Sequence, residues 1–117
     1  MSRAAASLAG MFAFTGTVHL VRPRIFDPAL PDWLPGGKRI WAIGSGVAEL
    51  GCGALVASPR TRRLGGWASA ALLVAVFPGN VHMVRTARTP RARTVTLLRL
   101  PLQAPLVWWA WRVARRG

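Results

Sequence analysis

Apolar residues gather in four long runs, and short stretches rich in charge, proline or glycine separate them. The runs cover residues 4–21, 40–57, 64–84 and 94–111. Each is close to the ~20 residues that an α-helix needs to cross a hydrocarbon layer of ~30 Å. The pattern therefore predicts an all-α protein with four transmembrane helices, and residues 1–117 form a single membrane domain.

The connectors between the runs predict how the helices are arranged. Residues 22–39 form the longest connector, which ends in two glycines and contains the prolines Pro23, Pro28, Pro31 and Pro35. Proline lacks an N–H group and restricts the residue before it, so this stretch cannot continue a helix. Residues 58–63 and 85–93 are shorter connectors, and short connectors make neighbouring helices antiparallel. We expect an antiparallel bundle with a proline-rich loop after the first helix.

Composition supports a membrane protein and argues against other classes. Of the 117 residues, 52% are hydrophobic, and the net charge is +13. Such a charge is typical of nucleic-acid binders, but here the basic residues lie in connectors and at helix ends, where anionic lipid headgroups meet them. We predict a lipid bilayer with anionic headgroups as the partner, and no nucleic acid. Because Cys52 is the single cysteine, an intrachain disulfide and a dithiol relay are excluded.

Two charged side chains interrupt the apolar runs, Glu49 in the second and Arg99 in the fourth. A charge inside a bilayer is costly unless it faces the bundle interior and finds a partner, so we expect these two side chains to pair. Around Glu49, the positions three, four and seven residues away are small: Ala42, Ser45, Gly46, Cys52 and Gly53. Small residues let helix backbones approach closely, which places Glu49 at an interior seam. Two interpretations of the pair are open: a functional site, or a link between helices.

Further polar residues accompany this pair. Thr96, Arg99 and Gln103 share one helix face, and Asn80 and His19 belong to the third and first runs. At ~1.5 Å of rise per residue, His19, Asn80, Arg99 and Gln103 fall in the half of the bilayer nearer the proline-rich loop, and Glu49 lies near the midplane. This convergence predicts a small polar pocket for a quinone-like or other lipophilic ligand. No metal site is predicted, because no two of His19, His82 and Glu49 have the helical spacing of a ligand pair.

The last apolar run ends in aromatic and basic residues, namely Trp108, Trp109, Trp111, Arg112, Arg115 and Arg116. Tryptophan favours the headgroup layer, and long arginine side chains reach from a helix end to lipid phosphates. We interpret this segment as a membrane anchor. Basic residues are divided almost evenly between the two sides, and the cluster Arg60, Arg62 and Arg63 in a short connector favours cytoplasmic termini.

Five motifs along the chain resemble the DoxX-like family of membrane proteins. They are Pro31-Asp32-Trp33-Leu34-Pro35, Ser45-Gly46-Val47-Ala48-Glu49-Leu50-Gly51, Pro59-Arg60-Thr61-Arg62-Arg63, Phe77-Pro78-Gly79-Asn80 and Leu98-Arg99-Leu100-Pro101-Leu102-Gln103. The resemblance implies four transmembrane helices, termini that are usually cytoplasmic, and motif residues at Glu49, Asn80, Arg99 and Gln103. Relatives include a subunit of a thiosulfate:quinone oxidoreductase, although most members have no assigned activity. The chain departs from the family pattern at two positions. Asp32 stands where relatives often have proline, and Gly79 where alanine is common, and neither change alters the expected fold.

The leading functional hypothesis is a redox-associated subunit of the cell (inner) membrane, multi-pass, with a polar pocket and no catalytic activity of its own. No resident cofactor is required, and a quinone is the small molecule that the pocket favours. The protein partners that we predict are a membrane or redox protein, or a second copy of the chain. A non-catalytic scaffold, in which Glu49 and Arg99 only join helices, is the alternative. A small transporter is third, because the ionisable groups do not cross the bilayer.

Overall fold

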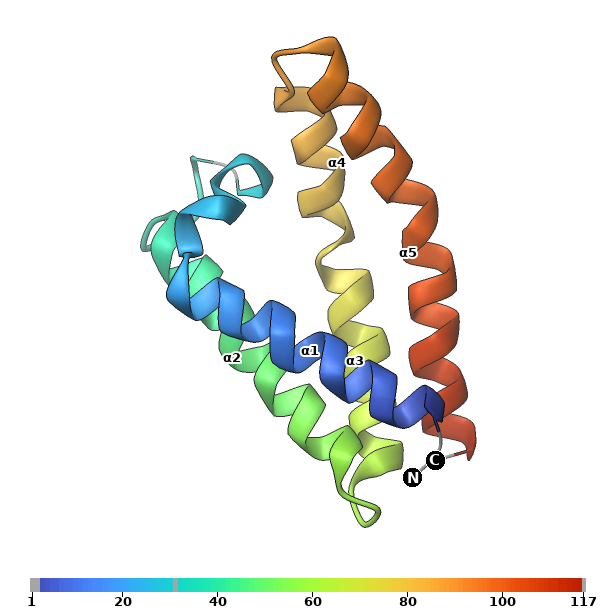
Figure 1. Ribbon diagram of the computed structural model, residues 1–117. Helices are drawn as coiled ribbons and strands as arrows, with labels where there is room; N and C mark the ends of the chain where they lie inside the picture. The colour runs from blue at the N-terminus through green and yellow to red at the C-terminus, as the bar shows by residue number, and fades with distance from the viewer. Residues whose placement is uncertain (1–2, 31, 117) are drawn as a thin grey trace.

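The computed structural model describes residues 3–30 and 32–116, and these form helices and connecting turns (Figure 1). The elements are α1 (Arg3–Val21), the 3₁₀ helix η1 (Pro23–Ala29), α2 (Lys38–Ala57), α3 (Arg62–Ala75), α4 (Phe77–Thr86) and α5 (Pro90–Arg116). The predicted all-α class is confirmed. Met1, Ser2, Pro31 and Gly117, which the sequence analysis included in the domain or its loop, lie outside the described residues.

Three helical segments are long and apolar enough to cross a membrane: α1, α2 and the stretch Arg62–Thr86, which joins α3 to α4. This agrees with a membrane location. Helix α5 is the longest helix of the described chain, at 27 residues, but it is not in this group. Its apolar run is interrupted by Arg99 and Gln103, which lower its mean hydropathy.

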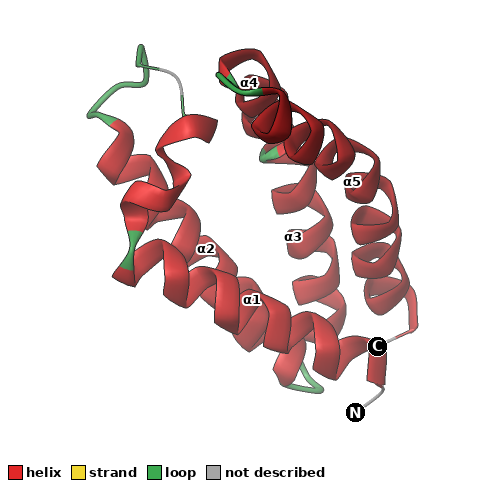
Figure 2. Cartoon of the chain, turned by 45° about the horizontal axis from the view of Figure 1, so that its top comes forward, coloured by secondary structure: helices red, strands yellow, loops and turns green. Residues whose placement is uncertain are grey.

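The helices pack as two layers, with α1 against α2 and with α3 and α4 against α5 (Figures 1 and 2). Small residues allow the close approach in each layer. A Cβ atom on Gly46 of α2 would lie 2.9 Å from the Gly16 carbonyl oxygen of α1. A Cβ atom on Gly66 of α3 would lie 2.4 Å from the Ala114 nitrogen of α5. The backbones themselves are therefore in contact in both layers.

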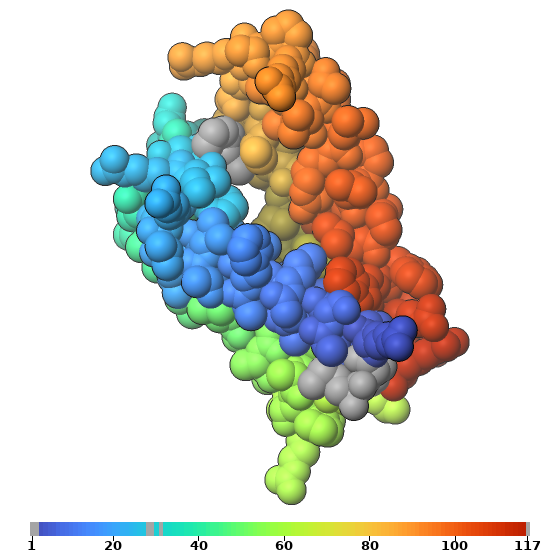
Figure 3. Space-filling model, in the orientation of Figure 1, coloured from blue at the N-terminus to red at the C-terminus, as the bar shows by residue number. Residues whose placement is uncertain are grey.

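The two layers meet in an apolar core toward the end of the molecule where both termini lie (Figure 1). The core consists of Ala5, Leu8, Phe12, Cys52, Val56, Leu73, Ala110 and Val113. At the other end η1 contacts α1, α2 and α4, so it bridges the layers. Between these two contacts the space-filling view shows a hollow, with the α1–η1 side on one flank and the α4–α5 side on the other (Figure 3).

Three expected boundaries differ from the structure. The predicted third helix, residues 64–84, is interrupted at Val76, and α4 begins with Pro78 near its start, where a missing N–H costs nothing. The predicted fourth helix, residues 94–111, extends over 90–116, because the helix begins at Pro90, a favourable first position, and continues past the apolar run into the basic residues on both sides. The connector 22–39 is not wholly irregular, since it contains η1.

The turn between α2 and α3 is held by side chains that bind the last carbonyls of α2. Thr61 Oγ1 donates to the Leu55 carbonyl at 2.7 Å, and Arg62 Nε donates to the Val56 carbonyl at 2.9 Å. Because the last carbonyls of a helix have no donor within it, these bonds stabilise its end. The Arg62 guanidinium therefore binds the end of α2 and does not extend freely from the surface.

Candidate functional site

The first polar cluster lies between α1 and α2, where His19 meets Glu49. Nε2 of His19 is 3.4 Å from Oε2 of Glu49, and the side chains are 12% and 15% exposed. Nδ1 of His19 lies 3.0 Å from the Ala42 carbonyl oxygen. The imidazole also stacks on Phe26 of η1, with ring centroids 3.5 Å apart. Backbone on one side and an aromatic ring on the other thus hold the histidine against the carboxyl group.

The hydrogen bond of His19 Nδ1 limits the protonation states in which His19 and Glu49 attract each other. The Ala42 carbonyl can only accept, so Nδ1 must carry a hydrogen. In a neutral imidazole Nε2 would then be an acceptor facing another acceptor, Oε2 of Glu49. The contact is attractive only when one proton is on either Nε2 or the carboxyl group. A single proton on either group would make the pair neutral overall, which would lower the cost of placing it among apolar helices.

The predicted ion pair between Glu49 and Arg99 is not formed. The acidic group's partner is His19, whereas Nη1 of Arg99 donates to Oε1 of Gln103 at 3.0 Å. Glu49 lies on the face of α2 that contacts α1, with Ala42 and Gly46 buried on the same face. Arg99 finds an acceptor one turn along its own helix, because residues four apart are neighbours on a helix surface. The prediction was wrong because it assumed that opposite charges pair across the bundle.

The second cluster joins α3, α4 and α5 through Gln103, which is 4% exposed. Its Oε1 accepts from Arg99 and, at 3.3 Å, from Nδ2 of Asn80. Its Nε2 donates to the Leu73 carbonyl. The carbonyl lies in the last turn of α3, where the helix cannot supply a donor. A side chain of α5 therefore caps the end of α3.

All six predicted site residues are in the described chain, and the structure distributes them over the two layers. His19 and Glu49 belong to the α1–α2 layer, and Asn80, Arg99 and Gln103 to the α3–α4–α5 layer. Thr96 is separate from both groups, since its Oγ1 donates to the Ala92 carbonyl of its own helix at 2.9 Å. The two layers flank the hollow (Figure 3).

Some partners in the site were missed by sequence reasoning. Phe26 lies in the proline-rich connector and carries no chemical signal of its own, although an aromatic residue beside a membrane helix end is a recognisable pattern. The carbonyls of Ala42 and Leu73 are backbone groups, and no residue type marks them.

One oxygen of the first cluster retains unused bonding capacity. Oε2 of Glu49 is buried and accepts no hydrogen bond within residues 3–30 and 32–116. Its contact with His19 at 3.4 Å is longer than a charge-assisted hydrogen bond, which is about 2.7–2.9 Å. A ligand O–H or N–H group would satisfy it. Within the same residues, no three His, Cys, Asp or Glu side chains lie close enough together to hold a metal ion.

One protein family matches most of the chain. A family described as a domain of unknown function, DUF8561, matches residues 8–114. The chain belongs to the DUF8561 family. The matched range contains both polar clusters, from His19 to Gln103. No curated protein and no solved structure matches the chain.

Proposed function

We propose that this DUF8561 chain is a redox-associated integral membrane subunit that binds a quinone-like lipophilic molecule between its two helix layers. In this proposal α5 crosses the bilayer together with α1, α2 and the α3–α4 segment, in an antiparallel four-helix bundle. The termini are cytoplasmic, and the connector between α1 and α2 lies outside. The observation that carries the proposal is that two polar clusters belong to the two helix layers that flank the hollow, namely His19 with Glu49 and Gln103 with Asn80 and Arg99 (Figure 3).

The two clusters offer complementary chemistry to such a headgroup. The carbonyl oxygens of a quinone accept hydrogen bonds, and Arg99 and Asn80 are donors on the α4–α5 flank. The hydroxyl group of a reduced quinone can donate to Oε2 of Glu49, which has no hydrogen bond. An isoprenoid tail would leave between the layers into lipid, as expected for an apolar site with few polar groups. The redox association itself is supported by the resemblance to DoxX-like proteins.

A scaffold function is the second candidate, and a separate observation favours it. Gln103 is bonded at both ends of its amide group, and Arg99 and Asn80 both donate to it. Such a network acts as a link between helices, since polar side chains join transmembrane segments. In that case the protein binds other proteins and no small molecule.

Ligand binding distinguishes the two candidates. Purified protein in nanodiscs is titrated with a short-chain quinone analogue, and binding is followed by tryptophan fluorescence quenching. Asn80→Leu removes a donor to the oxidised quinone, and Glu49→Leu, tested with the reduced form, removes the acceptor for its hydroxyl group. Each change should weaken binding by about tenfold, the equivalent of one hydrogen bond.

Thr17→Val is the matched control, because Thr17 is exposed and its hydroxyl donates to the Ala13 carbonyl of its own helix at 2.6 Å. This variant should bind as the native protein does. A native sample that melts cooperatively yet shows no saturable quenching would refute ligand binding and support the scaffold.

A further inference from the structure

The last turns of α5 have one buried and one open face. Ala110, Val113 and Ala114 are at most 3% exposed, and Ala114 packs directly on Gly66 of α3. The residues of the other face are Trp108, Trp111, Arg112, Arg115 and Arg116. Because the buried face is locked against α3, the open face presents its side chains from a fixed helix end.

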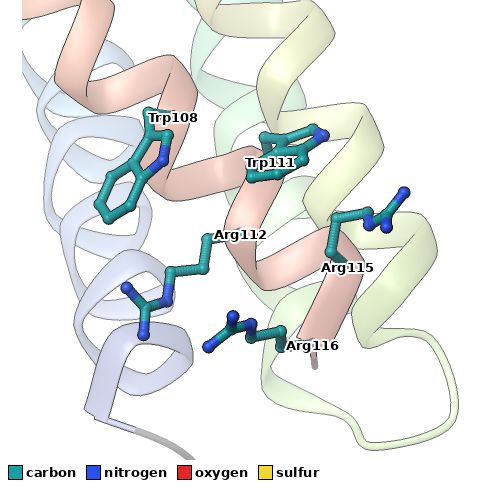
Figure 4. A pocket seen from close by; sticks show the side chains of 5 residues that line it. All are labelled: Trp108, Trp111, Arg112, Arg115 and Arg116. Atoms are coloured by element: carbon teal, nitrogen blue, oxygen red, sulfur yellow. The ribbon is translucent and has the colours of Figure 1, made fainter.

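These five residues line a groove of about 420 Å³ (Figure 4). The guanidinium carbon of Arg112 is 5.4 Å from the centre of the Trp108 ring, and that of Arg115 is 5.6 Å from the Trp111 ring. The spacing of four residues sets each arginine beside its tryptophan. Figure 4 shows Arg112 and Arg116 extending to the same side of α5.

The groove has positive charge and, among the described residues, no counterion. Its lining holds three guanidinium groups and no acidic side chain. Within the described ranges, both salt bridges are formed elsewhere, between His19 and Glu49 and between Lys38 and Asp32. The negative end of the helix dipole amounts to about half a charge, which does not neutralise three cations. An anion bound here would therefore be attracted by all three guanidinium groups.

The position of the groove identifies the source of that anion. The C-terminal end of α5 lies beside the start of α1 and at the same end of the molecule as the α2–α3 turn (Figure 1). Helices α1 and α2 are long and apolar enough to cross a membrane, so their ends lie at its surface. Tryptophan side chains favour the headgroup layer. A groove with cations and two indole rings at this depth meets phospholipids.

We propose that this groove is a binding site for one anionic phospholipid, whose phosphate lies between Arg112 and Arg116. Arginine binds phosphate oxygens through two parallel N–H groups, and two arginines one turn apart match one phosphate. The Trp108 and Trp111 rings pack against the glycerol and upper acyl chains. The site is independent of the proposed quinone site, which belongs to the other end of the helices.

A lipid titration in detergent, read by native mass spectrometry, tests the site. Phosphatidylglycerol should bind the native protein with one tight equivalent, and phosphatidylcholine should not. Arg112→Gln with Arg116→Gln should weaken the phosphatidylglycerol equivalent by about 30-fold, because each surface arginine adds roughly fivefold to anionic-lipid affinity.

Arg60→Gln with Arg63→Gln is the matched control, since it removes two exposed charges from the turn at the same end of the molecule. This control should retain the tight equivalent. Equal losses in the two double variants would show charge attraction without a site and would overturn the proposal.

Two further measurements test whether a loss of lipid binding comes from the groove itself. Trp108→Leu, at a position that is 54% exposed, should leave the melting temperature unchanged and weaken the lipid several-fold. Full lipid affinity in this variant contradicts the groove. Inorganic phosphate at lipid-equivalent concentration should not displace the lipid, and displacement would identify a site for free phosphate and refute the lipid site.

Discussion

At the scale of single residues, this chain stabilises polar groups among apolar helices in two ways. His19 lies 3.4 Å from Glu49 in the α1–α2 seam, where one proton on either group would leave the pair without net charge. Gln103 instead satisfies several neighbours at once, binding Arg99, Asn80 and the Leu73 carbonyl. Both arrangements follow from the high cost of an unpaired polar group away from water.

The partnership of His19 and Glu49 can be tested by removing one or both groups. Glu49→Leu should lower the free energy of unfolding by about 1–3 kcal/mol, because Nε2 of His19 loses its partner. His19→Leu combined with Glu49→Leu should recover most of this loss, since no polar group is then left unpaired. Thermal unfolding in detergent measures both. If Arg99→Leu, and not His19→Leu, recovered the free energy of unfolding lost by Glu49→Leu, the partner of Glu49 would be Arg99, as the sequence suggested.

Gln103→Leu tests the second arrangement. It leaves the Leu73 carbonyl and the Arg99 guanidinium without their partner, and we expect a loss of about 1–3 kcal/mol in unfolding free energy. Thr96→Val on the same helix is the control, with an effect within about 0.5 kcal/mol, because the Thr96 hydroxyl binds only carbonyls of its own helix. Similar effects of the two changes would show that Gln103 does not cap α3.

At the scale of elements, backbone contact through glycine determines which helices pair. Gly46 meets Gly16 across α1 and α2, and Gly66 meets Ala114 across α3 and α5. In lipid there is little hydrophobic drive between helices, so close packing and polar contacts hold them together. The interruption at Val76 then gives α4 its own contact with α5.

Gly66→Ala should separate α3 from α5. The new Cβ atom would meet the Ala114 backbone, which cannot rotate away, and overpacking of this kind costs about 1–3 kcal/mol. Gly44→Ala in α2 has nothing within 4 Å and should stabilise the protein by about 0.5–1 kcal/mol through helix propensity. Melting temperatures that move in opposite directions would confirm the contact. A rise for Gly66→Ala would contradict it.

At the scale of the whole molecule, both termini and the α2–α3 turn lie at one end, and η1 lies at the other (Figure 1). If the proposed orientation holds, the η1 end faces outside the cell. The lipid groove and the hollow then face opposite membrane leaflets. Basic residues are present at both ends, so their number does not decide the orientation.

Cysteine labelling decides the orientation. In a Cys52→Ala background, Trp33→Cys places a thiol at a position that is 78% exposed in the connector between α1 and α2. A membrane-impermeant maleimide should label it in intact cells, whereas Arg60→Cys should react only after permeabilisation. The reverse pattern of labelling would place the termini outside.

Much of the fold could be predicted from the sequence, because its cause is local. The length of an apolar run determines whether a helix can span a bilayer, and the runs containing α1, α2 and α3–α4 are recognisable without a structure. The small residues around Glu49 likewise predicted the buried face of α2, where Ala42, Gly46 and Gly53 are buried.

Only the tertiary structure decided which groups meet. Helical spacing tells which side chains share a face, but the partner of Glu49 depends on how α2 rotates and crosses α1, and the glycine contacts between backbones set that geometry. The cap on α3 depends on where the helix stops and which distant amide reaches it, and neither is encoded at one position. Apolar length is a property of a segment, whereas pairing is a property of the packed molecule.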